Sequence, residues 1–191
     1  MSRRRATWLA IGGVLVVVLV AALAIFEPWL LVVDRTADDA DDPAAVVGTA
    51  SGGLTDTAVP SASGDELTRV VLASADFIDG EHDTAGRATV YRRSDGSRFL
   101  RIEDLATSNG PDLHVWLTDK PSGGSCDGCR DSWGIYDDDA YVRLGELKGN
   151  RGDQSYEIPA SADLSAMRSV VIWCDRFNVA FGTAAIGRGE A

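Results

Sequence analysis

The distribution of apolar residues divides the chain into an N-terminal apolar run and a longer region of short apolar segments separated by polar turns. Residues 6–26 read ATWLAIGGVLVVVLVAALAIF and contain neither a charged residue nor a proline. A helix of this length rises about 1.5 Å per residue and spans roughly 31 Å, close to the ~30 Å hydrocarbon core of a bilayer. The pattern therefore predicts one transmembrane α-helix.

The flanks of this run predict its orientation. Arginines occupy positions 3–5, and positive residues stay on the cytoplasmic side of a membrane. A cleaved signal peptide is the alternative, but its apolar region is shorter and ends at small residues, whereas this run ends at Phe26. We expect a cytoplasmic N-terminus over 1–5 and an uncleaved signal-anchor helix with its flank over 6–33. The chain is then a single-pass protein of the cell membrane, with its C-terminal domain extracytoplasmic.

Residues 34–66 predict a flexible acidic linker. The segment is rich in Ala, Asp, Gly, Ser and Thr and has no aromatic residue, so it cannot bury enough apolar surface to offset the entropy cost of ordering. Four aspartates near its start could bind calcium, but Pro43 and the intervening alanines provide no ligand loop, which favours a solvated linker. These aspartates are Asp38, Asp39, Asp41 and Asp42.

Residues 67–188 predict a mostly β domain. Apolar segments recur about every ten residues between turn signals, which is typical of an antiparallel β-sandwich or barrel-like fold. Ser94-Asp95-Gly96 has the composition of a hairpin turn, and residues 163–167 suggest one short helical turn. The expected strands cover 86–93, 98–102, 112–118, 141–147, 154–158, 168–174 and 177–186.

Charge and motifs exclude several classes of function. The chain carries 18 Lys and Arg against 29 Asp and Glu, a formal net charge of −11. Since an acidic surface repels phosphate groups, we expect no nucleic-acid partner. The sequence also lacks a phosphate-binding loop, a zinc-protease helix and a nucleophile elbow. This favours a protein that is not an enzyme by itself.

Two of the three cysteines are close in sequence. Cys126 and Cys129 form a C-D-G-C motif within a loop rich in Gly and Asp. Outside the cytoplasm such a pair is expected to oxidise to a structural disulfide. A reversible redox pair and half of a zinc site are the alternatives.

The third cysteine, Cys174, lies at the end of the most apolar expected strand, on the face of Ile172. One interpretation is a buried, inert thiol. The other is a functional thiol, either a redox group or a ligand for a metal or haem. Both follow because an unpaired thiol in an oxidising compartment must be shielded or used. The two histidines of the chain, His82 and His114, are possible ligands. His114 should face away from Leu113 and its apolar neighbours. A soft ligand set would exist if either histidine met Cys174, although no full set is evident for haem or metal.

Several segments in this order resemble the DM-thirteen domain, also called the electron-transfer DM-thirteen domain. They read LRIEDL at 100–105, SNGPDLHVWL at 108–117, LGELKGN at 144–150, GDQSYEIP at 152–159 and VVIWCDRFNVAFG at 170–182. The resemblance extends over about residues 70–186. It implies a small extracellular β-rich domain with a redox role centred on Cys174, and His82 also fits the family pattern. Cys126 and Cys129 lie where the family is variable.

Two functions are consistent with these features. The first is a membrane-anchored extracytoplasmic redox or electron-transfer accessory that acts through Cys174 with an extracytoplasmic redox partner. The alternative is a non-catalytic binding or scaffold module at the cell surface, in which Cys174 is a structural buried thiol and the partner is a surface ligand. The resemblance favours the first.

Overall fold

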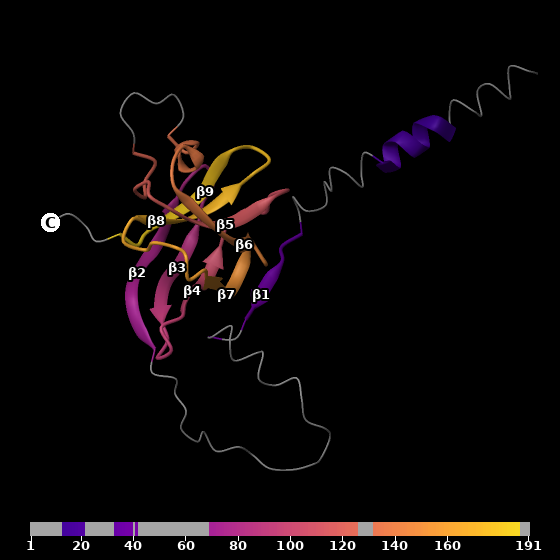
Figure 1. The fold of residues 1–191 in the computed structure, drawn as a ribbon. Helices are drawn as coiled ribbons and strands as arrows, with labels where there is room; N and C mark the ends of the chain where they lie inside the picture. The colour runs from indigo at the N-terminus through magenta and orange to yellow at the C-terminus, as the bar shows by residue number, and fades with distance from the viewer. Residues whose placement is uncertain (1–12, 22–32, 40, 42–68, 126–131, 188–191) are drawn as a thin grey trace, which may run out of the picture.

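The computed structural model describes residues 13–21, 33–39, 41, 69–125 and 132–187. They contain a helix at 13–21 and a nine-stranded sheet (Figure 1). The strands are β1 (Thr36–Asp38), β2 (Val70–Asp79), β3 (Ala85–Arg92), β4 (Arg98–Ala106), β5 (Leu113–Thr118), β6 (Tyr141–Glu146), β7 (Arg151–Ile158), β8 (Ser169–Cys174) and β9 (Val179–Ala185), and a short 3₁₀ helix, η3 (Ile135–Asp137), precedes β6.

The strands form a single curled sheet, a half-barrel, with the order β1-β7-β4-β3-β2-β9-β8-β5-β6. Only β1 and β7 pair in parallel, and all other neighbours are antiparallel. The long strand β2 pairs with β3 through residues 70–76 and with β9 through residues 77–79, so it joins the two halves of the sheet. The expected mostly β, antiparallel architecture is confirmed, as one curled sheet.

Apolar side chains cover both faces of the part of the sheet that β5, β8 and β9 form. The main core lies inside the curl and includes Val115, Ile172 and Phe181. A second cluster on the outer face contains Trp116 and Trp173 together with Ile135 and Tyr136 of η3. Strand β8 is buried along its whole length. Burial on both faces explains why its sequence is a continuous apolar run.

The observed strands follow the expected ones closely, but β1 and β2 were not expected. Strands β3, β5, β6 and β8 lie within one residue of the expected limits at each end, β4 extends four residues further, and residues 163–167 form turns. No strand was expected over 70–79, where β2 lies. Its centre reads ASAD and alternates, but the inward residues there are alanines, which are small and poor strand formers, so the signal is weak.

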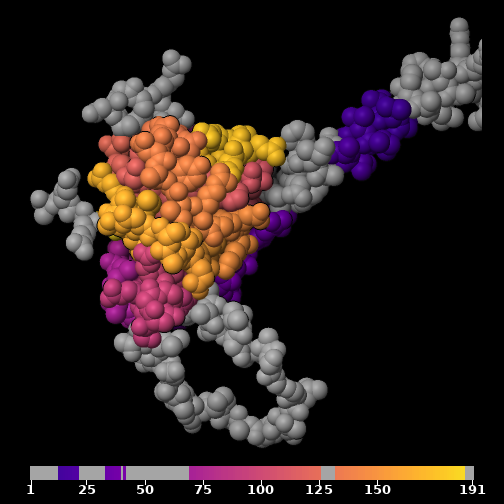
Figure 2. All heavy atoms as spheres, in the orientation of Figure 1, coloured from indigo at the N-terminus to yellow at the C-terminus, as the bar shows by residue number. Residues whose placement is uncertain are grey.

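The first residues of the expected linker belong to the sheet. Thr36–Asp38 forms β1 and pairs in parallel with Arg151–Asp153 of β7. Figure 2 shows this indigo segment lying against the edge of the globular body. The expectation of a flexible linker is therefore wrong at 36–38, because hydrogen bonds to an open sheet edge order a segment that has no apolar core of its own. Residues 40 and 42–66 of the expected linker lie outside the described residues.

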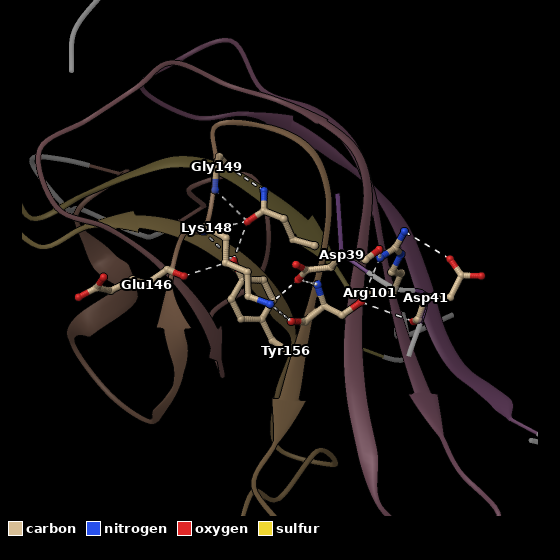
Figure 3. A network of polar contacts seen from close by, with 9 residues as sticks. Asp39, Asp41, Arg101, Glu146, Lys148, Gly149 and Tyr156 are labelled. Carbon is tan, nitrogen blue, oxygen red and sulfur yellow. Dashed lines mark hydrogen bonds and ion pairs between the residues drawn. The ribbon is translucent and has the colours of Figure 1, made fainter. Parts of the chain in front are cut away.

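Acidic side chains near β1 hold it to basic residues of the sheet, as Figure 3 shows. Asp39 accepts hydrogen bonds from the Lys148 ammonium and from the Ser155 backbone N–H at 3.0 Å. Arg101, which is buried, forms ion pairs with Asp41 at 3.4 Å and with Asp153 at 2.7 Å. Burial opposes ionisation of Asp39, but the hydrogen bond from Lys148 and its charge leave the pKa of this carboxyl below its ordinary value. Two of the aspartates expected to be solvated, Asp39 and Asp41, thus stabilise the attachment of β1.

Two glycines leave room for this segment. A Cβ on Gly152 would collide with the Ala37 carbonyl oxygen, and a Cβ on Gly149 would collide with the Arg35 carbonyl oxygen. Gly152 also has a φ of 90°, in the region that favours glycine. The connection from β6 and the first residues of β7 are therefore matched to residues 35–37.

The structure describes only part of the expected membrane segment. Residues 13–21 are helical, whereas 6–12 and 22–32 lie outside the described residues. Within the described part of the chain, no helix has both the length and the apolar character needed to cross a bilayer.

Candidate functional site

Four loops that carry the candidate residues meet at one end of the sheet. Because consecutive strands are antiparallel, the connections β2–β3, β4–β5, β6–β7 and β8–β9 all leave from this end. His82 lies in the first connection, Asp112 in the second, and Cys174 and Asp175 lie at the start of the fourth. The fold thus gathers residues that are almost a hundred positions apart.

Cys174 ends β8 and is fully buried, with its side chain in the main core beside Ile172 as expected. A tight turn follows, in which the Asn178 N–H donates to the Cys174 carbonyl oxygen at 2.8 Å and Asn178 has a φ of 57°. Burial raises the pKa of the Cys174 thiol, although backbone N–H groups of Phe177 and Arg176 directed at the sulfur act in the opposite direction. The sulfur is therefore a protonated, solvent-shielded thiol that nearby peptide groups can polarise.

His114 does not meet Cys174. In the β5–β8 pairing Leu113 is opposite Cys174, and His114 is opposite Trp173. Neighbouring residues of a strand point to opposite faces, so Cys174 points into the core and His114 points outward with Trp173. The sequence predicted this outward direction of His114 correctly.

The structure places His114 in a different cluster. Its Nε2 lies 2.9 Å from Asp112 Oδ1 and 3.5 Å from Asp175 Oδ2, and ligand atoms of the three residues all lie within 4.8 Å of one another. Among the residues that the structure describes, this is the one group of three or more such side chains close enough to share a metal ion. One imidazole and two carboxylates form a donor set suited to a first-row transition metal.

Arg143 of β6 already neutralises part of this cluster. Its guanidinium donates two hydrogen bonds to the Asp175 carboxylate, at 2.7 and 3.2 Å. A bidentate pair of this kind occupies both oxygens of the carboxylate. A metal ion at this site would therefore have to use the lone pairs of Asp175 that Arg143 leaves free, and the guanidinium charge opposes a cation there.

His82 lies apart from both groups. Its ring packs on Phe181, with 3.9 Å between ring centroids, and its backbone N–H donates to the Phe181 carbonyl oxygen at 3.3 Å. It shares no three-ligand cluster with Cys174 in the described part of the chain. Cys126 and Cys129, the expected disulfide, lie outside the described residues.

Sequence reasoning did not identify Asp112, Asp175 and Arg143. Asp112 and His114 are two positions apart and so lie on one side of the chain in extended conformation, a signal that was present in the sequence. The contribution of Asp175 depends on the pairing of β5 with β8, and that of Arg143 on the pairing of β5 with β6. Neither pairing is visible in the sequence.

Comparison with known proteins identifies one match. The family model described as Electron transfer DM13 matches residues 76–186, more than half of the chain and nearly the whole sheet from β2 to β9. This description indicates a redox-related role. Neither the curated proteins nor the solved structures contain a match to this chain.

Proposed function

The chain belongs to the electron transfer DM13 family, and we propose that it is a membrane-anchored, extracytoplasmic accessory that exchanges single electrons through the region of Cys174. The observation that carries this proposal is the complete burial of the only cysteine within the described residues, at the loop end of the family-matched sheet. Its partner would be an extracytoplasmic redox protein or a small diffusible redox molecule.

The environment of Cys174 favours electron transfer over thiol–disulfide exchange. Exchange requires a thiolate that can touch the incoming sulfur. The Cys174 thiol has a raised pKa and no solvent exposure, so it meets neither requirement while the turn over residues 175–178 is closed. Electron transfer needs no such contact, since the electron can cross a few ångströms of packed protein.

The sequence supports the proposed membrane location. The uncharged run at 6–26 has the length of a bilayer span, and the arginines at 3–5 favour a cytoplasmic N-terminus. Fractionation of cells that express the full chain tests this: we expect it in the carbonate-resistant membrane fraction, with residues 69–187 accessible to protease added outside. A carbonate-soluble chain would contradict the anchor.

Redox titration of the full chain in detergent tests the role of Cys174. The titration counts the electrons that an oxidant takes from each protein. In a background with Cys126→Ser and Cys129→Ser, Cys174→Ser should yield fewer electrons than the parent protein. Val170→Ala, on the same strand and face, is the matched control because it perturbs the core and leaves the sulfur in place. An absorbance spectrum of the same sample reveals any bound haem or metal.

The alternative predicts a different titration. If Cys174 is only a structural thiol in a surface binding module, Cys174→Ser and the parent protein will yield the same number of electrons. That result would refute the proposed function.

A further inference from the structure

Three aromatic side chains are stacked in a row on the outer face of the sheet, on three adjacent strands. Trp173 of β8 and Trp116 of β5 have ring centroids 4.9 Å apart, and Trp116 and Tyr141 of β6 have centroids 4.4 Å apart with only 9° between the ring planes. The strand register causes this arrangement. Trp116 is opposite Val171 and Arg143, so Trp173 and Tyr141 are its diagonal neighbours on either side.

The row leads from the interior to the surface. Trp173 and Trp116 are 0% and 1% exposed, whereas Tyr141 is 39% exposed. Trp173 directly precedes Cys174 in β8. A molecule in solution can therefore touch the row at Tyr141, while the row ends at the residue next to the family-matched cysteine along β8, on the opposite face of that strand.

The indole nitrogen of Trp116 has an unusual environment. Trp116 Nε1 is buried and finds no hydrogen-bond partner among the described residues. A buried donor without a partner costs about 1–3 kcal/mol of folding stability. Stability alone therefore does not explain a tryptophan at the centre of the row. An indole that loses one electron becomes a radical cation, which normally loses its N–H proton to a neighbouring base. Without an acceptor in the described part of the chain, oxidised Trp116 keeps its proton and can be reduced again by simple electron transfer.

A positive charge lies over the same ring. The Arg143 guanidinium is 4.7 Å from the Trp116 ring centroid and 5.9 Å from that of Tyr141. A cation over an aromatic face stabilises the neutral ring and opposes a positive charge on it. Oxidation should therefore pass through Trp116 without remaining there.

We infer that Tyr141, Trp116 and Trp173 form an electron relay between the protein surface and the interior beside Cys174. This inference rests on the proposed electron-transfer function and names its route. A high-potential one-electron oxidant in solution takes an electron from Tyr141, whose phenol proton passes to water. Trp116 returns an electron to the tyrosyl radical, which takes a proton back from water. Trp173 then reduces the Trp116 radical cation, so the oxidant gains one electron and Trp173 loses one.

Flash photolysis with a ruthenium polypyridyl complex and a sacrificial electron acceptor tests the relay, because it generates the Ru(III) oxidant in solution. The full chain is used in detergent, with Trp8, Trp29 and Trp133 replaced by phenylalanine so that only Trp116 and Trp173 can give a tryptophan radical. Transient absorption and electron paramagnetic resonance record that radical. Circular dichroism confirms that each variant is folded.

The order of the relay predicts different results for the variants. Trp173→Phe should retain a tryptophan radical, on Trp116, whereas Trp116→Phe should lose the signal because Trp173 is then isolated. Tyr141→Phe should also lose the signal, and since Tyr141 is partly exposed this variant disturbs the core little. Tyr91→Phe is the matched control, because Tyr91 is a partly exposed tyrosine that stacks on Phe99 in the other half of the sheet.

The relay is overturned if Trp116→Phe keeps the full radical signal or if Tyr91→Phe reduces it as much as Tyr141→Phe. Cys174→Ser separates the relay from the proposed function. With the oxidant supplied by light, the relay should give its signal in this variant whether or not the redox titration assigns electrons to Cys174.

Discussion

Cys174 and His114 lie on paired strands but project from opposite faces of the sheet. The pairing places Leu113 opposite Cys174, and one residue of offset along β5 directs the imidazole outward. A metal or haem site that uses both side chains therefore requires a different register. The sheet instead separates a shielded thiol from an outward polar cluster, and the two can be tested independently.

Burial of Cys174 predicts slow reaction with an aromatic disulfide reagent. In a background with Cys126→Ser and Cys129→Ser, the native protein should react roughly a hundredfold or more slowly than the unfolded chain, since the turn that covers the sulfur must open at a cost of about 3 kcal/mol. Thiol labelling followed by absorbance measures both rates. Equal rates in native and denatured protein would show that the sulfur is accessible.

The same thiol should make stability depend on alkaline pH. Burial raises the pKa of Cys174 above the ordinary 9.0, so the folded protein keeps a proton that the unfolded chain releases. Its contribution to stability is complete below pH 9.0 and is lost as the pH rises through the higher pKa of the folded state. Urea unfolding between pH 9.0 and 10.0 should show a steeper loss for the parent protein than for Cys174→Ala. Parallel curves would contradict this assignment.

Gly152→Ala should detach β1 from β7. The added Cβ would collide with the Ala37 carbonyl oxygen, in addition to the strain of a positive φ. Gly96→Ala is the matched control, because Gly96 has a φ of 86° with no atom close to the added Cβ, and this strain alone costs roughly 1–2 kcal/mol. Hydrogen exchange should accelerate at residues 36–39 in Gly152→Ala only. Equal exchange in both variants would show that the contact with β1 is unimportant.

Acid should weaken the attachment of β1. The pKa of Asp39 lies below its ordinary value of 3.8, because the interactions with Lys148 outweigh the opposing effect of burial. Its contribution to stability is therefore present above pH 3.8 and is lost as the pH falls through the lower value of the folded state. Hydrogen exchange of the Ser155 amide, which donates to Asp39, should increase over that range. Asp39→Asn should abolish the dependence, whereas Asp38→Asn, at the exposed last position of β1, should preserve it.

Removal of Arg143 should improve metal binding at Asp112, His114 and Asp175. Arg143→Ala leaves both Asp175 oxygens available and removes a competing positive charge, which should raise the affinity for Zn²⁺ or Mn²⁺ by about tenfold or more, equivalent to roughly 1.4 kcal/mol. Isothermal titration calorimetry measures the change. Arg87→Ala removes a surface arginine that pairs with Asp76 and should leave the affinity unchanged. An unchanged affinity in Arg143→Ala would show that the three side chains do not act as one ligand set.

The sequence by itself determined the mostly β character of the domain and most strand positions, because alternation and turn residues are local signals. It also determined the faces of His114 and Cys174, since side-chain direction within one strand depends only on parity. The resemblance carried by the segments from Leu100 to Gly182 was confirmed by the match to the DM13 family.

Only the tertiary structure decided which strands pair and in which register. That pairing brings Asp175 and Arg143 to His114, stacks Trp116 between Trp173 and Tyr141, and orders Thr36–Asp38 on β7. These contacts join residues that are distant along the chain. Their positions depend on how the whole sheet curls to bury its core, and no local pattern of residues encodes that geometry.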